Sequence, residues 1–212
     1  MGSGQTQKEL RLLFFIIKPR DPREVKMKAL GTKELQTDRL ILRRFRLEDA
    51  NEAYKNWMSR DQVTKFLTWK TNKSEKESEA TIKSWVENYE DLNFYQWAIE
   101  TKEKKELIGS ISIVRIDEKI EMMGVGYCIG DRWWHKGYTS EALKRVVKFA
   151  FEEVGANRFE ARHDLKNPNS GKVMEKAKMI YEGTLRKSAM SNSGLGDMAI
   201  YSILRKDYKK GD

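Results

Sequence analysis

Residues 131–143 read DRWWHKGYTSEAL: two tryptophans, a basic pair and a glycine run directly into a predicted helix. The segment before them, 122–130 (MMGVGYCIG), is apolar and typical of a strand. After them, apolar residues recur every three or four positions from Thr139 to about Val154, which predicts a helix. A strand, a short loop and a helix therefore follow one another, as in α/β proteins.

A loop of this kind can bind an anion. The first amides of a helix have no partner within it, and the helix dipole adds positive potential. Gly137 would let the backbone approach an oxygen closely, while Arg132 and Lys136 would add positive charge. In the alternative interpretation, Trp133 and Trp134 only fill the edge of the core. The stretch matches neither the P-loop pattern nor the dinucleotide-binding fingerprint.

The rest of the chain predicts one mixed sheet of the α/β class with helices on both faces. Strands cluster first and then alternate with helices, and the three strands between 94 and 130 are typical of an antiparallel meander. Ser74 and Glu77 have the spacing of a capping box. The expected strands are 35–45, 94–100, 107–116, 122–130, 157–164, 179–187 and 197–206, and the expected helices are 47–58, 74–89, 139–154 and 167–178.

Composition narrows the classes of protein. The length of 212 residues fits one domain with an extension. Cys128 is the only cysteine, so no intramolecular disulfide is possible, and we expect a reducing, cytoplasmic location. His135 and His163 are the only histidines and lack zinc-ligand spacing, so no metal is expected. The net charge of +9 favours an anionic ligand or partner, either nucleic acid or a phosphorylated cofactor.

Residues 1–34 are interpreted as an N-terminal extension, followed by a domain at 35–208 and a tail at 209–212. The opening MGSG is typical of a cloning leader, and Met27 would suit a native start. The apolar run at 10–18 is shorter than the ~20 residues of a membrane helix, so no membrane association is expected.

A second strand-to-helix junction lies at residues 167–176 (NPNSGKVMEK). Asn-Pro is a turn signal, and Ser170 is a natural helix cap, a role that explains Ser170 without any ligand. Two neighbouring junctions of this kind can, however, line one cleft at the carboxyl ends of the strands. The pattern therefore adds support for a shared site, and two separate helix caps stay the alternative.

From Leu35 to Tyr208, the sequence resembles the GNAT superfamily of acetyl-CoA-dependent N-acetyltransferases, particularly the branch of ribosomal-protein alanine N-acetyltransferases. The resemblance rests on the order and spacing of TDRLILRRF (37–45), IGSISI (108–113), GVGYCIGDRWWHKGYTSEAL (124–143) and NPNSGKVMEKAKMIYEGTLR (167–186). It implies a mixed, mostly antiparallel sheet of six to seven strands with helices on both faces. It also implies acetyl-CoA as the donor and CoA as the product.

The resemblance assigns roles to both junctions. The loop before the 139–154 helix is expected to hold the CoA pyrophosphate through its amides. The strand end before that loop is expected to splay from the neighbouring strand and bind the pantetheine arm, with the 167–170 turn close to the thioester. The implied cofactor-binding residues are Tyr127, Cys128, Ile129, Arg132, Trp134, His135, Lys136, Gly137, Tyr138, Thr139, Asn167 and Ser170.

The sequence departs from the family pattern at three positions. Lys178 stands where relatives usually have glycine, but it is remote from the chemistry. His135 stands where the pattern prefers glycine. Gly124 stands where relatives often carry a carboxylate, and the nearest acids are Glu121 and Glu160. Glu121 is the expected general base, acting directly or through water. In the alternative interpretation, Glu121 is an exposed carboxylate in a turn and has no catalytic role.

Acetyl transfer also needs a polarised carbonyl and a proton for the leaving sulfur. A backbone N–H near Tyr127 is the expected oxyanion donor, and Asn167 or Ser170 the expected donor to sulfur. The expected catalytic residues are thus Glu121, Asn167 and Ser170. Cys128, in mid-strand without a histidine nearby in sequence, is expected to pack as a small hydrophobic residue rather than carry the acetyl group.

The acceptor is expected to be a primary amine, and its identity stays open between a protein N-terminus and a small molecule. A polyamine or aminoglycoside site would be rich in carboxylates, whereas a protein terminus needs an open groove. Phe66 and Trp69 are expected to shape the entry. The alternative is a non-catalytic module that binds CoA or nucleic acid. Nucleic acid is not the expected partner, and the chain is expected to be a monomer or homodimer.

Overall fold

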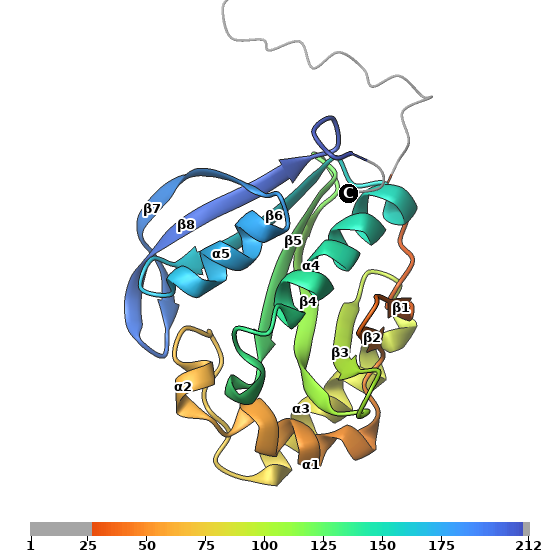
Figure 1. Ribbon diagram of the computed structural model, residues 1–212, viewed down its shortest axis with the longest axis vertical. Helices are drawn as coiled ribbons and strands as arrows, with labels where there is room; N and C mark the ends of the chain where they lie inside the picture. Colours follow the sequence, from red (N-terminus) through yellow and green to blue (C-terminus); the bar gives the residue numbers. More distant parts are fainter. Residues whose placement is uncertain (1–26, 210–212) are drawn as a thin grey trace, which may run out of the picture.

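The computed structural model describes residues 27–209, which contain an eight-stranded sheet. The sheet runs through the middle of the molecule (Figure 1). Its strand order is β1-β2-β3-β4-β5-β6-β8-β7. Neighbouring strands are antiparallel except for the parallel pair β5–β6. The strands are β1 (Leu35–Gln36), β2 (Leu40–Arg43), β3 (Tyr95–Thr101), β4 (Leu107–Asp117), β5 (Met122–Ile129), β6 (Arg158–Asp164), β7 (Ile180–Ser191) and β8 (Gly194–Leu204).

The predicted class, a mixed and mostly antiparallel sheet between helices, is confirmed. There are eight strands rather than six or seven because the stretch 35–45 forms a short hairpin. Leu35 pairs with Leu42, and the Thr37 amide donates to the Leu40 carbonyl at 3.0 Å, which closes the turn. The meander β3–β4–β5 is also confirmed.

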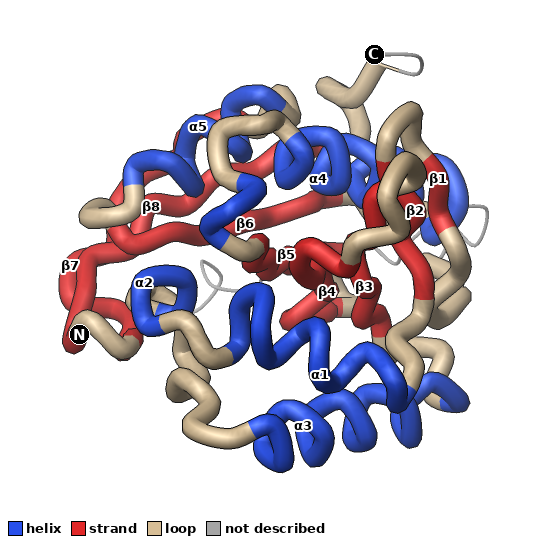
Figure 2. The backbone as a smooth tube through the Cα atoms, turned by 60° about the horizontal axis from the view of Figure 1, so that its bottom comes forward, coloured by secondary structure: helices blue, strands red, loops and turns tan. Residues whose placement is uncertain are grey.

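Helices cover both faces of the sheet (Figure 2). The helices α1 to α3 lie on one face, and α4 and α5 lie on the other. None of the helices within residues 27–209 is long and apolar enough to cross a membrane. The α-helices are α1 (Ala50–Ala53), α2 (Asp61–Thr64), α3 (Glu75–Glu87), α4 (Tyr138–Phe149) and α5 (Pro168–Lys176). The 3₁₀ and π turns are η2 (Leu47–Asp49), η3 (Tyr54–Met58), η4 (Asn88–Glu90), η5 (Asp131–Trp133) and η6 (Ala150–Val154).

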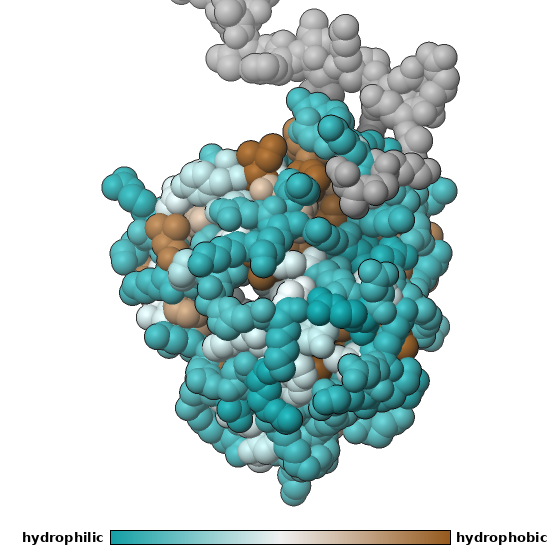
Figure 3. All heavy atoms as spheres, in the orientation of Figure 1, coloured by the Kyte–Doolittle hydropathy of each residue, from teal (hydrophilic) through white to brown (hydrophobic). Residues whose placement is uncertain are grey.

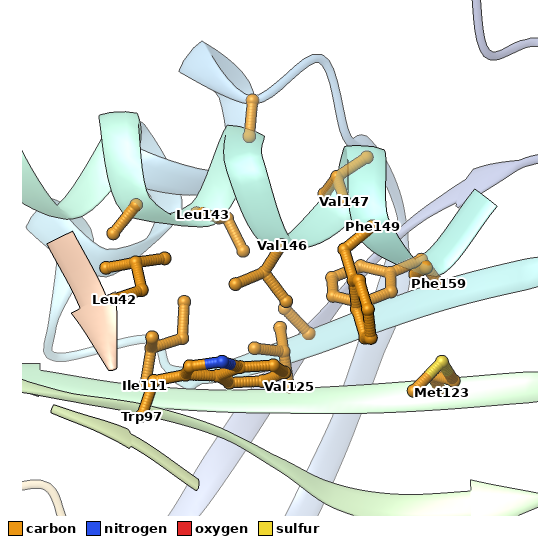
Figure 4. Close-up of a cluster of buried hydrophobic side chains, with 14 of the residues drawn as sticks. Leu42, Trp97, Ile111, Met123, Val125, Leu143, Val146, Val147, Phe149 and Phe159 are labelled. Atoms are coloured by element: carbon orange, nitrogen blue, oxygen red, sulfur yellow. The ribbon is translucent and has the colours of Figure 1, made fainter. Parts of the chain in front are cut away.

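The larger core lies between α4 and the sheet (Figure 4). Leu143 and Val146 project from α4 toward Trp97 on β3, which is fully buried. The Trp97 ring meets that of Phe149 edge to face at 5.7 Å, and its indole N–H donates to the Lys33 carbonyl at 2.7 Å. The apolar period that predicted this helix therefore marks its buried face.

The smaller core joins α1 and α3 to the opposite face of the sheet. Trp57 and Ile82 are both fully buried and lie in the ranges 47–58 and 74–89, which are predicted as helices. The predicted capping box at Ser74 is wrong. Glu77 accepts a hydrogen bond from the Lys73 amide at 3.0 Å instead of the Ser74 amide, and the Ser74 side chain caps nothing.

The folded domain begins before residue 35, so the predicted boundary is corrected for residues 27–34. Lys28 donates its amide to the Val154 carbonyl at 2.8 Å, and the Leu30 amide donates to the Tyr95 hydroxyl at 3.0 Å. Thr32 is buried and donates to the Phe94 carbonyl. The predictions for the apolar run 10–18 and for the opening MGSG lie outside the described residues.

The parallel strands β5 and β6 separate halfway along their length. They pair from Met122 with Arg158 to Val125 with Ala161, and no pairing follows. On its other side β5 stays paired with β4 as far as Ile129. The edge of residues 126–129 that faces β6 is therefore open, as predicted.

The face that carries α4 and α5 is mostly hydrophilic, with small hydrophobic patches (Figure 3).

Candidate active site

A cleft of about 230 Å³ opens where β5 and β6 separate. The end of β5, the loop before α4, one side of α5 and the segment that contains α2 form its walls. Its lining residues are Val63, Phe66, Leu67, Tyr127, Cys128, Ile129, Trp133, Trp134, His135, Gly137, Thr139, Ser140, Asn167, Asn169, Ser170, Lys172, Val173 and Lys176. The two strand-to-helix junctions thus share one cleft, as the sequence predicts.

The loop before α4 presents a row of backbone amides. Within residues 27–209, the amides of residues 135–140 have no hydrogen-bond acceptor, whereas the next amide, that of Glu141, donates to the Gly137 carbonyl at 3.1 Å. These amides belong to the first turn of α4 and the loop that leads into it, where a helix leaves its donors unused. They form a cradle of the kind that binds phosphate groups.

Two residues with positive φ give the loop its shape. Gly137, the residue before α4, has φ +80°, a conformation that costs glycine little. His135 has φ +61°, in the left-handed region that side chains disfavour. This explains why the family pattern prefers glycine there, and His135 nevertheless lines the cleft.

The two tryptophans of the loop have different places. Trp133 is buried and belongs to the core, which agrees for this residue with the interpretation that the tryptophans fill the edge of the core. Trp134 is 38% exposed, lines the cleft, and donates its indole N–H to the Ile129 carbonyl at 2.9 Å. That bond ties the loop that carries the amide cradle to the end of β5.

The open edge of β5 offers further backbone donors. The Gly130 amide donates to the Ile108 carbonyl of β4 at 2.8 Å. Because N–H directions alternate along a strand, the Cys128 amide also points to β4, and the amides of Tyr127 and Ile129 point to the open side. An extended arm placed along this edge would meet them as a neighbouring strand does.

Tyr127 and Ser170 join the two sides of the cleft. The Tyr127 hydroxyl lies 2.9 Å from the Ser170 hydroxyl and donates to the Ser170 carbonyl at 3.0 Å. Burial raises the pKa of Tyr127, so its hydroxyl stays protonated and remains a donor. Asn167 precedes α5 as its cap residue, but its side chain makes no cap hydrogen bond and lines the cleft instead.

Three of the predicted cofactor-binding residues lie outside the lining. Arg132 stacks on the Trp133 ring at 4.9 Å, and Tyr138 lies under the Arg39 guanidinium at 4.5 Å. Lys136 is exposed, and its carbonyl accepts from Arg39 at 3.1 Å. The side chains of these three residues therefore do not wall the cleft, although the amides of Lys136 and Tyr138 belong to the cradle.

The prediction that Glu121 is the general base is corrected. Glu121 precedes β5, whereas the cleft lies at the end of that strand, so six residues, about 20 Å, separate it from Tyr127. It is not an exposed turn carboxylate either, because only 7% of it is exposed. None of the cleft-lining residues is an Asp or Glu.

Cys128 borders the cleft, but its side chain packs with the smaller core, and its sulfur lies 3.5 Å from the Ser110 hydroxyl. Burial raises the pKa of this thiol to about 11, so it is protonated at neutral pH and is a poor nucleophile. We therefore expect Cys128→Ala to keep acetyl transfer within about threefold of wild type, measured as thiol release. A loss on the order of 100-fold would contradict this account, because only a covalent role predicts it.

The sequence did not reveal the remaining walls of the cleft. Lys172 and Lys176 lie one turn apart on α5 and both reach the cleft, and their i, i+4 spacing was the available signal. Val63 and Leu67 join Phe66, whose place was predicted, to form an apolar wall. Trp69 is not among the lining residues. Within residues 27–209, no group of three or more His, Cys, Asp or Glu side chains is placed to hold a metal ion.

Comparison with known proteins identifies the family. The profile of the acetyltransferase (GNAT) domain matches residues 39–180, which is more than half of the chain. The chain belongs to the GNAT acetyltransferase family. It is 32% identical over 171 residues to the uncharacterized N-acetyltransferase YoaA of Bacillus subtilis, covering 81% of this chain and 96% of that one. This GNAT chain is therefore an acetyltransferase, and its family uses acetyl-CoA.

Two further similarities are informative. This GNAT chain is 26% identical over 153 residues to the putative ribosomal N-acetyltransferase YdaF of Bacillus subtilis, covering 71% of this chain and 82% of that one. The predicted likeness to the ribosomal-protein branch is thus confirmed. The crystal structure of the microcin C7 self-immunity acetyltransferase MccE with acetyl-CoA and AMP shares the fold, with a TM-score of 0.69, 22% identity and coverage of 79% of this chain and 93% of that one.

Proposed function

We propose that this GNAT enzyme moves the acetyl group of acetyl-CoA to a primary amine by direct attack on the thioester. One observation carries the proposal: the row of free amides at residues 135–140 lies beside the open edge of β5 in the same cleft. The amides suit a diphosphate, and the strand edge suits an amide-bearing arm. His135, Lys172 and Lys176 add basic groups to the lining, which fits an anionic ligand.

The residues of the cleft suit the transfer step. A new bond forms between the amine nitrogen and the acetyl carbon, the carbon–sulfur bond breaks, the amine loses a proton, and the sulfur gains one. The open amides of β5 can stabilise the carbonyl oxygen as it becomes negative. Ser170, held against the protonated Tyr127 hydroxyl, is our proposed hydrogen-bond donor to the departing sulfur, which takes its proton from water in the open cleft. Asn167 orients the thioester beside it.

The amine proton has no carboxylate to receive it among the lining residues. We propose that water in the open cleft takes it and that no dedicated general base exists. Holding the two reactants in place then supplies much of the rate, an effect worth roughly 7–11 kcal/mol in well-oriented systems. Such an enzyme prefers an amine that is already partly neutral, such as a peptide N-terminus with a pKa near 8.

The cleft favours a protein or peptide N-terminus over a polycationic small molecule. A polyamine or an aminoglycoside needs several carboxylates, and the lining has none, whereas it has two lysines. The printed name of the relative YdaF, a putative ribosomal N-acetyltransferase, agrees with a protein acceptor. A cytoplasmic location and a monomeric or homodimeric state remain predictions.

The Tyr127 hydroxyl gives a specific prediction. Tyr127→Phe removes the hydrogen bonds to Ser170, so the Ser170 hydroxyl loses its fixed position. We expect kcat to fall about tenfold, the value of one or two net hydrogen bonds. The Kd for acetyl-CoA should change less than threefold by isothermal titration calorimetry, because the amide cradle is untouched. An unchanged kcat would remove Tyr127 and Ser170 from the proposed step.

Two measurements test the function as a whole. Thermal shift should show stabilisation by acetyl-CoA and CoA but not by RNA, since ligands stabilise only the fold that binds them. Thiol release should then be screened with a hexapeptide that begins with alanine, with spermidine and with kanamycin. The account predicts turnover with the peptide. Stabilisation by CoA without turnover of any amine would favour a non-catalytic CoA-binding module, and stabilisation by RNA alone would favour a nucleic-acid binder.

A further inference from the structure

The apolar wall of the cleft stands on a short segment with little structure of its own. Residues 60–71, here called the acceptor-side segment, contain only the four-residue helix α2. The segment contributes Val63, Phe66 and Leu67 to the cleft. A single helical turn is not stable alone, so contacts from other elements must fix these three side chains in place.

One end of the segment is tied to the loop before α4. Arg60 forms an ion pair with Asp131, with Nε 2.5 Å from Oδ1, and its Nη2 donates to Oδ2 at 2.8 Å. Gln62 donates to the same carboxylate. Asp131 begins η5, directly before the amide cradle. This end of the segment is therefore anchored to the acetyl-CoA side of the cleft.

The other end is tied to the β7–β8 hairpin by hydrogen bonds from Asn192. Its side-chain Nδ2 donates to the Thr64 carbonyl at 2.9 Å and to the Trp69 carbonyl at 2.7 Å. Its backbone amide donates to the Leu67 carbonyl at 3.1 Å. Figures 1 and 2 both place α2 next to the end of this hairpin. These three hydrogen bonds connect positions that are more than 120 residues apart in sequence. Their acceptors lie on and around Phe66 and Leu67.

We propose that Asn192 is a positioning residue for the amine acceptor. By holding residues 64–69 against the hairpin, it fixes the apolar wall against which an acceptor chain lies while its amine meets the thioester. This inference rests on the proposed function. Asn192 lies outside the cleft lining, so it acts through the acceptor-side segment and does not touch the reacting atoms.

The substitution Asn192→Asp tests this role at nearly constant size. A carboxylate cannot donate, so both side-chain bonds are lost, and the new negative charge faces two carbonyl oxygens. With the alanine-initiated hexapeptide, the KM for peptide should rise at least about fivefold, since two hydrogen bonds of the wall are lost. The KM for acetyl-CoA should stay within about twofold because its anchors, the amide cradle and the β5 edge, are unchanged.

Two further measurements separate positioning from general damage. Hydrogen–deuterium exchange should rise in residues 61–70 of Asn192→Asp and stay unchanged in residues 134–145. Ser193→Ala, at the next position of the same hairpin, removes a hydroxyl that bonds to the Ser191 hydroxyl of the hairpin, and it should match wild type in every assay. If the wild type is active and Asn192→Asp has the same KM for peptide, the proposal is overturned. A rise of the KM for peptide and the KM for acetyl-CoA by the same factor would also overturn it. A wild type that acetylates no amine would instead contradict the proposed function itself.

Discussion

Gly137→Val is expected to weaken acetyl-CoA binding on the order of 100-fold, because the side chain is incompatible with the loop conformation. Space is not the limit: a Cβ at this position would lie 3.4 Å from the Arg39 guanidinium, an ordinary contact. The backbone is the limit, since Gly137 has φ +80° and a β-branched residue avoids that region. The loop would leave its present conformation and the amides of residues 135–140 would no longer converge.

The matched control for this prediction is Gly155→Val. Gly155 has φ +88° and ends the same helical stretch at η6, far from the cleft. Both variants should lose a similar 1–2 kcal/mol or more of folding free energy, roughly the cost of a left-handed residue. Only Gly137→Val should lose acetyl-CoA affinity in isothermal titration calorimetry. Equal affinities in the two variants would show that the loop does not bind the cofactor.

Trp97→Ala is expected to lower the free energy of unfolding by about 3–5 kcal/mol. Trp97 is fully buried beneath α4, and removing its ring leaves a cavity in the larger core and an unpaired Lys33 carbonyl. Domains of this kind are stabilised by roughly 5–15 kcal/mol, so the loss is a large fraction of the total. Urea denaturation followed by circular dichroism measures it directly.

Trp134→Ala provides the comparison for Trp97→Ala. It removes the same atoms from a side chain that is 38% exposed, so about 1 kcal/mol should be lost, mainly the net value of its hydrogen bond to Ile129. A loss at Trp134 as large as that at Trp97 would contradict the assignment of one tryptophan to the core and the other to the cleft.

The elements that the sequence predicts best are those whose signal is local. The helix that begins at Tyr138 is visible because its buried face repeats every three to four residues. The amide cradle is visible because a strand, a glycine loop and a helix start follow one another. The splay of β5 from β6 comes from the family resemblance, since no residue in either strand signals it alone.

The errors concern three-dimensional position. Glu121 is near Tyr127 in sequence, but a residue before a strand lies at the opposite end from residues that follow it. The early start of the domain depends on backbone groups of Lys28 and Lys33 that bond distant elements, and backbone bonding leaves no pattern in the side chains. The contacts of Asn192 likewise leave no local sequence pattern, since its partners lie more than 120 residues away.

The central claim is that the amides before α4 hold the diphosphate of the cofactor. A crystal structure of the full chain with acetyl-CoA tests it most directly. The account predicts phosphate oxygens within about 2.7–3.2 Å of several amides in residues 135–140, with the arm of the ligand along Tyr127 and Ile129. Acetyl-CoA bound elsewhere, with those amides facing only solvent, would contradict it.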